Sequence, residues 1–148
     1  MAFRFVLAPL LRLRQSVERQ RALQLQEATL EVTRVRESLG RLEQFLAESA
    51  RADHANLEQG RRGAELQFAS LLRLNLEALR HSLETELGEA ERKQQGAAEE
   101  YHRAFREREV LETLRTHQRR TYQQESLRRE QRDLDAAHLI QRWRGPAR

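Results

Sequence analysis

The residues of this sequence that could do chemistry are its five histidines and the carboxylates close to two of them. Glu99 and His102 are three positions apart, and Asp135 and His138 repeat that spacing. On a helix this spacing puts a carboxylate and an imidazole on one face, as in the di-iron sites of helical bundles. Such a site also needs carboxylates from the other helices of a closed four-helix core. The chain has only two long helical stretches, so we interpret both pairs as solvated side chains.

No other pattern in the sequence indicates catalysis. The sequence has no HExxH motif, no phosphate-binding loop and no nucleophile elbow. Cysteine is absent, which excludes a disulfide framework, a thiolate nucleophile and a cysteine-based metal site. We therefore expect a protein that is not an enzyme, with no catalytic residue, no metal and no cofactor.

The composition favours long helices over a globular core. Charged residues make up 34% of the chain and aromatic residues only 5%, so apolar side chains can cover a narrow seam but not a large core. The net charge of +4 is unevenly spread: it is positive in 1–36 and 101–148 and negative in 37–64 and 65–100. Both ends are therefore basic and the middle is acidic.

Apolar spacing predicts the first helix at about 9–58. A regular three–four spacing, the heptad of a left-handed coiled coil, joins Leu25, Ala28, Val32, Val35, Leu39, Leu42 and Leu46. Pro9 suits a first helical turn, and the pair Gly60 and Gly63 predicts a turn at about 59–63.

The second helix is predicted at about 64–143, where Gly145-Pro146 ends it. Its seam is expected at Leu72, Leu76, Leu79, Leu83, either Leu87 or Glu86, Ala90, Gln94, Ala97 and Tyr101. The fold class is therefore all-α: two long helices in an antiparallel coiled-coil hairpin, with 1–148 as a single coiled-coil unit. A parallel dimer of one continuous helix is the alternative, and the glycine pair disfavours it. Glycines inside the helices are expected to mark close approach or bending: Gly40, Gly88 and Gly96.

The two helices differ in length. If residue i opposes roughly 123 − i, Pro9 lies opposite about Leu114, and the second helix continues for about 30 residues, or about 45 Å. Only Phe3 to Leu7 could cover part of this overhang. Its thin apolar stripe comprises Tyr122, Leu127, Leu134, Leu139, Ile140 and Trp143. We expect Tyr122 and Trp143 to find no packing partner within the chain, and we interpret the stripe as an interaction site.

Two other classes of partner are disfavoured. Arginines at 115, 119, 120, 128, 129 and 132 could contact nucleic acid, but acids at 112, 125, 130, 133 and 135 are interleaved with them. Mixed signs are typical of a solvated helix face, so we expect no nucleic-acid partner. The apolar start of the chain is interrupted by Arg4 and is too short to span a membrane or to form a signal peptide. Membrane contact is expected to be peripheral only.

Two terminal motifs carry a family resemblance. The stretch Leu114-x7-Tyr122-x2-Glu125-x2-Arg128-x-Glu130-Gln131-x2-Leu134-Asp135 resembles the C-terminal signature of the FliJ family, coiled-coil proteins of bacterial flagellar export. The start Phe3-Arg4-Phe5-x-Leu7-x2-Leu10-Leu11-x-Leu13-Arg14, followed by Glu18, is similar to that family's N-terminus. Ala136 departs from the family, which more often has an acid there.

The resemblance implies a hairpin similar to the rotor stalk of rotary ATPases, placed in the pore of the flagellar export ATPase at the cytoplasmic face of the inner membrane. Further implied partners are the regulatory stator protein of that ATPase, the cytoplasmic domain of the export gate and substrate-specific export chaperones. The alternatives are a stalk protein of virulence type III secretion or a self-associating coiled-coil spacer. The partner-binding residues are expected to be Leu114, Tyr122, Glu125, Arg128, Glu130, Gln131, Leu134 and Asp135.

Overall fold

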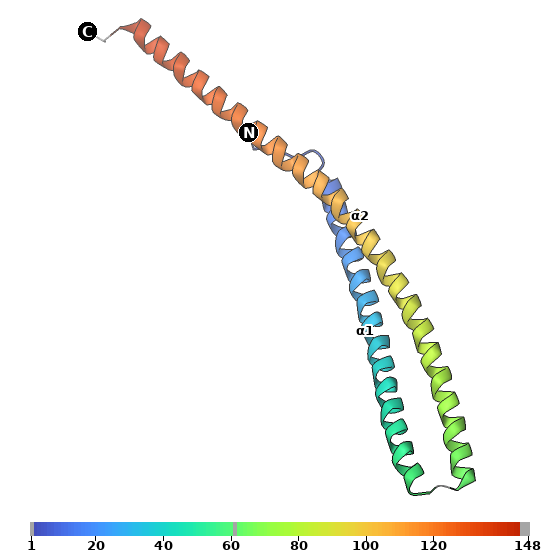
Figure 1. The fold of residues 1–148 in the computed structure, drawn as a ribbon. Helices are drawn as coiled ribbons and strands as arrows, with labels where there is room; N and C mark the ends of the chain where they lie inside the picture. Colours follow the sequence, from blue (N-terminus) through green and yellow to red (C-terminus); the bar gives the residue numbers. More distant parts are fainter. Residues whose placement is uncertain (1, 61, 146–148) are drawn as a thin grey trace. The chain divides into compact units, whose positions relative to one another are not determined.

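The structure is a computed structural model that describes residues 2–60 and 62–145. The described residues form two helices, α1 (Ala8–Glu58) and α2 (Gly63–Arg144), and contain no strand. The all-α fold with two long, mutually packed helices and a longer C-terminal helix is thereby confirmed (Figure 1). Of the residues expected at the helix ends, Arg61 in the turn and Pro146 after α2 lie outside the described residues.

Glycines with left-handed backbone end both helices. Gly60 follows α1 with φ of +82° and Gly145 follows α2 with φ of +65°, a conformation that glycine adopts without strain. On the other side of the turn, the carbonyl of Arg62 accepts bonds from the backbone N–H groups of Glu65 at 3.1 Å and Leu66 at 3.3 Å. These bonds close the first turn of α2, so α1 ends at Glu58 and α2 begins at Gly63.

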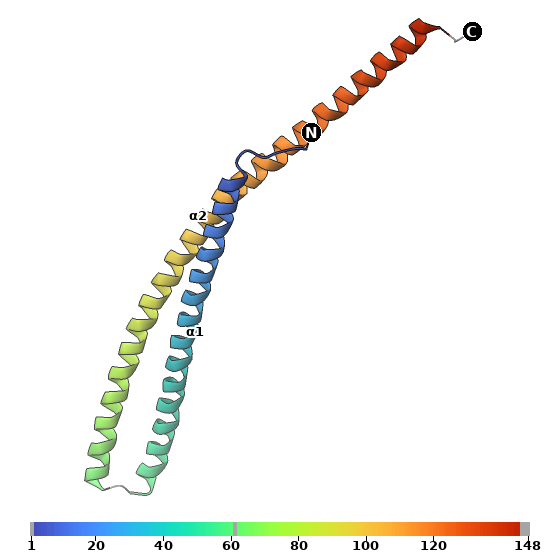
Figure 2. The ribbon, with the colours of Figure 1, turned by 180° about the vertical axis from the view of Figure 1, so that it is seen from behind.

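The chain divides into two compact units, and each of them pairs part of α1 with part of α2. The hairpin unit is Arg19–His102, which includes the turn; the terminal unit combines Met1–Glu18 with Arg103–Arg148. In the hairpin unit the two helices run side by side in opposite directions, as the two opposite views show (Figures 1 and 2).

The core of the hairpin unit is the predicted seam. Buried side chains at Val32 (2% exposed), Val35, Leu42 and Ala90 face the partner helix. Half-buried positions complete the seam on α1 at Leu25, Ala28, Leu39 and Leu46, and on α2 at Leu76, Leu83, Leu87, Gln94, Ala97 and Tyr101. The heptad spacing therefore identified the buried stripe of both helices.

Leu72 and Leu79 are exceptions, because both were expected in the seam but their side chains are 41% and 50% exposed. The residue after Leu79, Arg80, reaches across to α1, where its guanidinium lies 3.4 Å from a carboxylate oxygen of Glu43. An exposed ion pair thus flanks the seam at this level, where Leu42 of α1 remains buried.

Cross-helix contacts fix the register. In the hairpin unit Gln94 donates a hydrogen bond to Thr29 at 3.2 Å, and ion pairs join Arg36 to Glu91 at 2.7 Å and Arg73 to Asp53 at 3.0 Å. The two residue numbers of each such pair add up to between 121 and 127. This is close to the predicted pairing of residue i with residue 123 − i. The antiparallel pairing is therefore in the predicted register.

The terminal unit has a smaller core. Phe5, Leu11 and Ala104 are buried in it. Glu18 of α1 and Arg108 of α2 form an ion pair of 2.6 Å without hydrogen-bond geometry, and both side chains are mostly buried. A second ion pair, between Arg14 and Glu107, also joins the two helices. Apolar packing and partly buried ion pairs therefore hold the start of α1 against α2.

The glycines inside the helices do not mark close approach. A Cβ built on Gly40, Gly88 or Gly96 would meet no atom within 4 Å. The close-approach interpretation of these glycines is therefore wrong.

Candidate partner-binding surface

The carboxylate–histidine pairs are not assembled into a larger cluster. Within residues 2–60 and 62–145, no group of three or more His, Asp and Glu side chains could hold a metal ion. In the same residues, neither helix has a stretch long and apolar enough to cross a membrane. A candidate functional site must therefore be sought among the surfaces of the two units.

The end of α2 is the largest uncovered stretch of helix. We call residues 123–144 the uncovered segment. Every residue in it is exposed except Ser126, which is half-buried. Exposed fractions reach 64% at Leu127, 65% at Leu134 and 91% at Trp143. Such apolar exposure over successive turns of helix is typical of a surface that another molecule covers.

The expectation that Tyr122 has no packing partner within the chain is wrong. The extended residues before α1 run back along α2, and the ring of Phe3 lies 5.8 Å from that of Tyr122 in a tilted arrangement. This geometry is a favourable aromatic contact. Phe5, on the same segment, is only 7% exposed. The N-terminal segment therefore covers α2 as far as Tyr122, and the uncovered segment begins just after it.

The apolar residues of the uncovered segment do not form a single stripe. Helical geometry of about 100° per residue puts Leu127 and Leu134 within about 20° of each other, but Ile140 about 120° away from Leu134. Leu139, Ile140 and Trp143 form a separate apolar group in the last two turns, where they line a shallow hollow of about 450 Å³. The segment therefore presents apolar side chains on two faces.

The positions that would continue the seam beyond the terminal unit are mostly polar. Extending the spacing of Ala104, Arg108 and Leu111 gives Arg115, Gln118, Tyr122, Glu125, Arg129, Arg132 and Ala136. A seam of this composition does not need a permanent apolar partner helix to remain in water. It is suited to reversible contacts through charge and hydrogen bonds.

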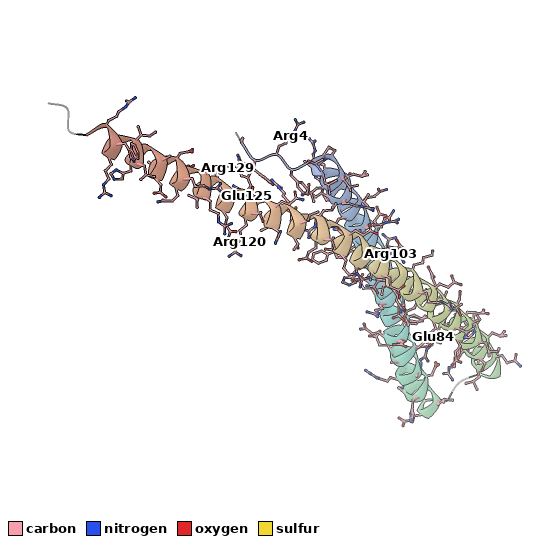
Figure 3. The ribbon with its side chains drawn as sticks, turned by 90° about the horizontal axis from the view of Figure 1, so that it is seen from above. Arg4, Glu84, Arg103, Arg120, Glu125 and Arg129 are labelled. Carbon is pink, nitrogen blue, oxygen red and sulfur yellow. The ribbon has the colours of Figure 1, made fainter. Side chains whose placement is uncertain are left out.

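Positive charge dominates this part of α2. Residues 115–144 hold eight arginines and four acids. Among the described residues, arginines 115, 119, 120, 128 and 132 form no ion pair, and the contact of Arg129 with Glu125 is long, at 4.0 Å, and solvent-exposed. Arg120 and Arg129 project from opposite sides of the helix (Figure 3). The guanidinium groups are thus available to a partner around the whole circumference.

The expected site residues lie on more than one face of α2. Leu114, Tyr122, Glu125 and Arg128 share one broad face, whereas Glu130, Gln131 and Leu134 lie on the opposite side and Asp135 lies between the two sets. Leu114 is 37% exposed and Tyr122 is half-buried, while the other six are exposed. Bonds along the helix involve some of them: Ser126 donates to Glu130 at 3.4 Å and Gln131 to Asp135 at 3.2 Å.

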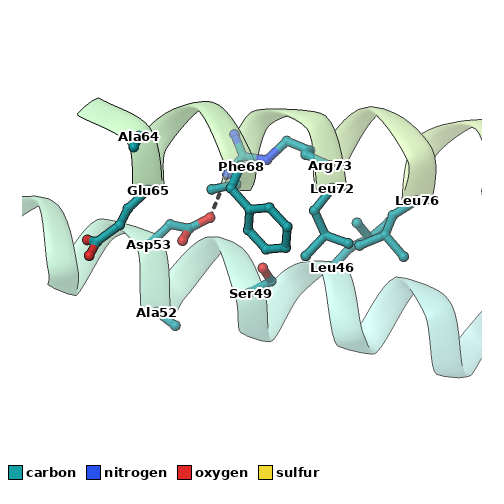
Figure 4. A pocket seen from close by; sticks show the side chains of 11 residues that line it. Leu46, Ser49, Ala52, Asp53, Ala64, Glu65, Phe68, Leu72, Arg73 and Leu76 are labelled. Atoms are coloured by element: carbon teal, nitrogen blue, oxygen red, sulfur yellow. Dashed lines mark hydrogen bonds and ion pairs between the residues drawn. The ribbon is translucent and has the colours of Figure 1, made fainter. Parts of the chain in front are cut away.

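Sequence reasoning missed a second surface, in the hairpin unit beside the turn. There the two helices enclose a groove of about 570 Å³, whose lining includes Leu46, Ser49, Phe68, Leu72 and Leu76 (Figure 4). Phe68 is 70% exposed. The groove combines three predicted seam residues, Leu46, Leu72 and Leu76, with Phe68, which lies four residues before Leu72; that helical spacing is the signal that could have revealed this surface.

These features define a class: a two-helix coiled-coil hairpin whose longer helix ends in an uncovered, arginine-rich segment. The family model described as "Flagellar FliJ protein" matches residues 3–147 of the chain. The chain therefore belongs to the FliJ family of flagellar export-associated coiled-coil proteins, a family of non-catalytic components of the export apparatus. No curated protein and no solved structure matches the chain.

Proposed function

We propose that the chain is a non-enzymatic stalk and escort component of the flagellar export apparatus, which binds the export ATPase ring through α2 beyond Leu114. One observation carries this proposal: 22 residues of regular helix, 123–144, have side chains exposed on all sides. A partner that lies beside a helix contacts one face. A partner that encloses the helix contacts every face, and the family-signature residues of this chain are spread around α2 in the way that an enclosing ring requires.

The charge of the segment supports the same proposal. An arginine-rich helix is attracted to a ring lined with carboxylates, and the polar seam positions let the contact form and break without exposing a large apolar surface. Binding of this kind promotes assembly of the ring by contact, and thereby protein export and flagellum assembly, and requires no catalytic residue in the chain.

The proposal includes further partners and a location. Residues 1–148 act as a single coiled-coil unit at the cytoplasmic face of the inner membrane, with peripheral membrane contact only. The regulatory stator protein of the ATPase, the cytoplasmic domain of the export gate and the substrate-specific export chaperones are its other partners. The match to a flagellar family over residues 3–147 favours flagellar export over virulence secretion.

The test is co-purification of the full chain with the flagellar export ATPase, with stimulation of ATP hydrolysis as the second readout. Leu134→Ala removes a side chain that is 65% exposed, so it should weaken binding and leave helicity unchanged. Tyr122→Ala should also weaken binding, but it removes the contact with Phe3 as well. Phe3→Ala, which removes the same contact and leaves α2 intact, is the matched control.

The outcome separates binding from folding. Wild-type chain that neither binds the ATPase nor stimulates it overturns the proposal. It is also overturned if Leu134→Ala reduces the helical circular dichroism signal while binding is kept. Light scattering on the same samples tests the spacer alternative, in which the uncovered segment self-associates and Leu134→Ala makes a multimer monomeric.

A further inference from the structure

Three arginines line one hollow of the terminal unit. Arg4 lies on the extended segment before α1 (Figure 3), Arg12 lies in the second turn of α1, and Arg115 lies on α2. The hollow has a volume of about 530 Å³, and among residues 2–60 and 62–145 its lining includes no acid. We call it the N-terminal hollow.

Arg12 and Arg115 occupy a level of the two helices at which an ion pair is expected. The ion pairs that cross between α1 and α2, such as that of Arg36 with Glu91, have residue numbers that add up to between 121 and 127. The numbers of Arg12 and Arg115 add up to 127, as do those of Arg36 and Glu91. The register therefore sets one arginine against another where other levels pair opposite charges.

No carboxylate compensates the charge of this hollow. Residues 2–17 contain three arginines and no acid, and residues 113–124 also contain three arginines and no acid. The acid that precedes the second stretch, Glu112, lines a different hollow. Within the described part of the chain, none of the three lining arginines forms an ion pair. Because all three are exposed, water and salt screen their mutual repulsion.

We propose that the N-terminal hollow binds a phosphate monoester, whose phosphate bridges Arg12 and Arg115 and accepts further bonds from Arg4. The fork of a guanidinium matches the oxygens of a phosphate in a bidentate arrangement. A phosphate monoester carries about two negative charges at neutral pH and has three strong acceptor oxygens, so it can engage three guanidiniums at once. A single carboxylate carries one charge and leaves most of the positive charge unmatched.

The size and lining of the hollow indicate an organic group attached to the phosphate. Small-molecule sites have volumes of about 300–1,000 Å³, and the volume of this hollow, about 530 Å³, lies within that range. Most of the lining beside the arginines is apolar, and it includes Phe5, Val6 and Pro9. Val6 is 84% exposed, so an apolar group on the ligand would cover it. The ligand class is therefore a phosphate monoester with a small apolar group.

Titration calorimetry of the full chain with phenyl phosphate tests this ligand class. We expect a dissociation constant on the order of 0.1 mM at low ionic strength, a range open to a ligand of few atoms. Inorganic phosphate lacks the apolar group, and benzoate has the ring but only one negative charge. Each should bind at least about tenfold more weakly than phenyl phosphate. Benzoate or inorganic phosphate that binds as tightly as phenyl phosphate overturns the proposed class.

Two double variants test the position of the site. Arg12→Gln with Arg115→Gln removes the facing guanidiniums and should raise the dissociation constant at least about tenfold. The helical circular dichroism signal should not change, because the variant removes two charges that repel each other. The matched control, Arg106→Gln with Arg120→Gln, makes the same charge change at exposed arginines of the terminal unit that do not line the hollow. Equal weakening by both variants overturns the proposal, because it would mean unspecific attraction of anions.

Arg115→Glu provides a readout in the chain itself. This change sets a carboxylate against Arg12 in the register of the other ion pairs, so it should abolish the binding of phenyl phosphate. It should also slow amide hydrogen exchange in residues 8–18. Phenyl phosphate should slow the same exchange in the wild-type chain but not in this variant. Faster exchange in the variant overturns the pairing of the two arginines on which the proposal depends.

Vesicles distinguish the two sources of such a phosphate, a free small molecule and a lipid headgroup. Phosphatidic acid carries a phosphate monoester on a lipid. Pelleting of the chain with phosphatidic acid vesicles that Arg12→Gln with Arg115→Gln abolishes assigns the site to a headgroup, whereas binding of phenyl phosphate without such pelleting assigns it to a small molecule. A wild-type chain that binds neither overturns the proposal. None of these measurements involves the export ATPase, so their outcome is independent of the proposed function.

Discussion

At the scale of single residues, stability depends on which helix positions have neighbours. The glycines inside the helices have none: a Cβ on Gly96 would meet nothing within 4 Å. Glycine in a helix interior costs about 1 kcal/mol relative to alanine. Gly96→Ala should therefore raise the free energy of unfolding by about 1 kcal/mol, measured by urea titration of the helical signal. Gly60→Ala is the contrast and should lower it, because φ there is +82°. A lower free energy of unfolding for Gly96→Ala would contradict the finding that a Cβ at this position has no neighbour.

Seam residues behave in the opposite way. Val32 is 2% exposed and contacts the partner helix from the centre of the hairpin unit, so Val32→Ala should lower the free energy of unfolding by about 2 kcal/mol. Leu30 lies two positions earlier and is 57% exposed. Leu30→Ala removes more atoms but should change the free energy by less than about 0.5 kcal/mol. Equal losses of unfolding free energy in the two variants would show that Val32 is not more buried against the partner helix than Leu30.

At the scale of the elements, the terminal unit depends on fewer contacts than the hairpin unit. One of them is the ion pair of Glu18 with Arg108, whose side chains are 17% and 22% exposed. Glu18→Gln leaves a mostly buried guanidinium without its counter-charge, so the start of α1 should open more readily, by about 1 kcal/mol. Amide hydrogen exchange over residues 8–18 measures this opening. Exchange in residues 25–46 is the internal control, and an equal change there would mean global destabilisation.

The sequence predicts the helices and their seam because heptad spacing is a local, repeated signal. Val32, Val35 and Leu42 could be identified as core from their positions alone, and the register followed from the place of the turn. Leu79 fits the heptad spacing but is 50% exposed, and the neighbouring Arg80 forms an exposed ion pair with Glu43 across the two helices. Spacing alone does not reveal how deeply each apolar position is buried.

The candidate surfaces were less predictable, because they depend on contacts and exposure that residue spacing does not encode. The contact of Phe3 with Tyr122 depends on an extended segment that has no periodicity, so no spacing rule could indicate it. The groove beside the turn was not predicted either, because Phe68 lies outside the positions that the heptad spacing of the seam selects. The lining of the groove and the exposure of Phe68 come only from the structure.

At the scale of the whole molecule, charge is divided between the two units. The terminal unit holds fifteen arginines and eight acids, a net charge of +7, whereas the hairpin unit holds twelve basic and fifteen acidic residues, a net charge of −3. An acidic partner is therefore attracted to the terminal unit and repelled by the hairpin unit. This division orients the chain during encounter before any specific contact forms.

The proposed binding to the export ATPase should consequently weaken as salt is added, because exposed charges are screened within about 10 Å at 0.1 M ionic strength. Arg128→Glu with Arg132→Glu, two unpaired arginines of the uncovered segment, should weaken binding at low salt by about tenfold or more, with the difference from wild type shrinking at high salt. The same charge change at two exposed arginines of the hairpin unit, Arg51→Glu with Arg92→Glu, should have little effect. Titration calorimetry at several salt concentrations measures both. Equal weakening by the two pairs would mean that net charge alone governs binding, and that the position of the arginines on α2 has no part in it.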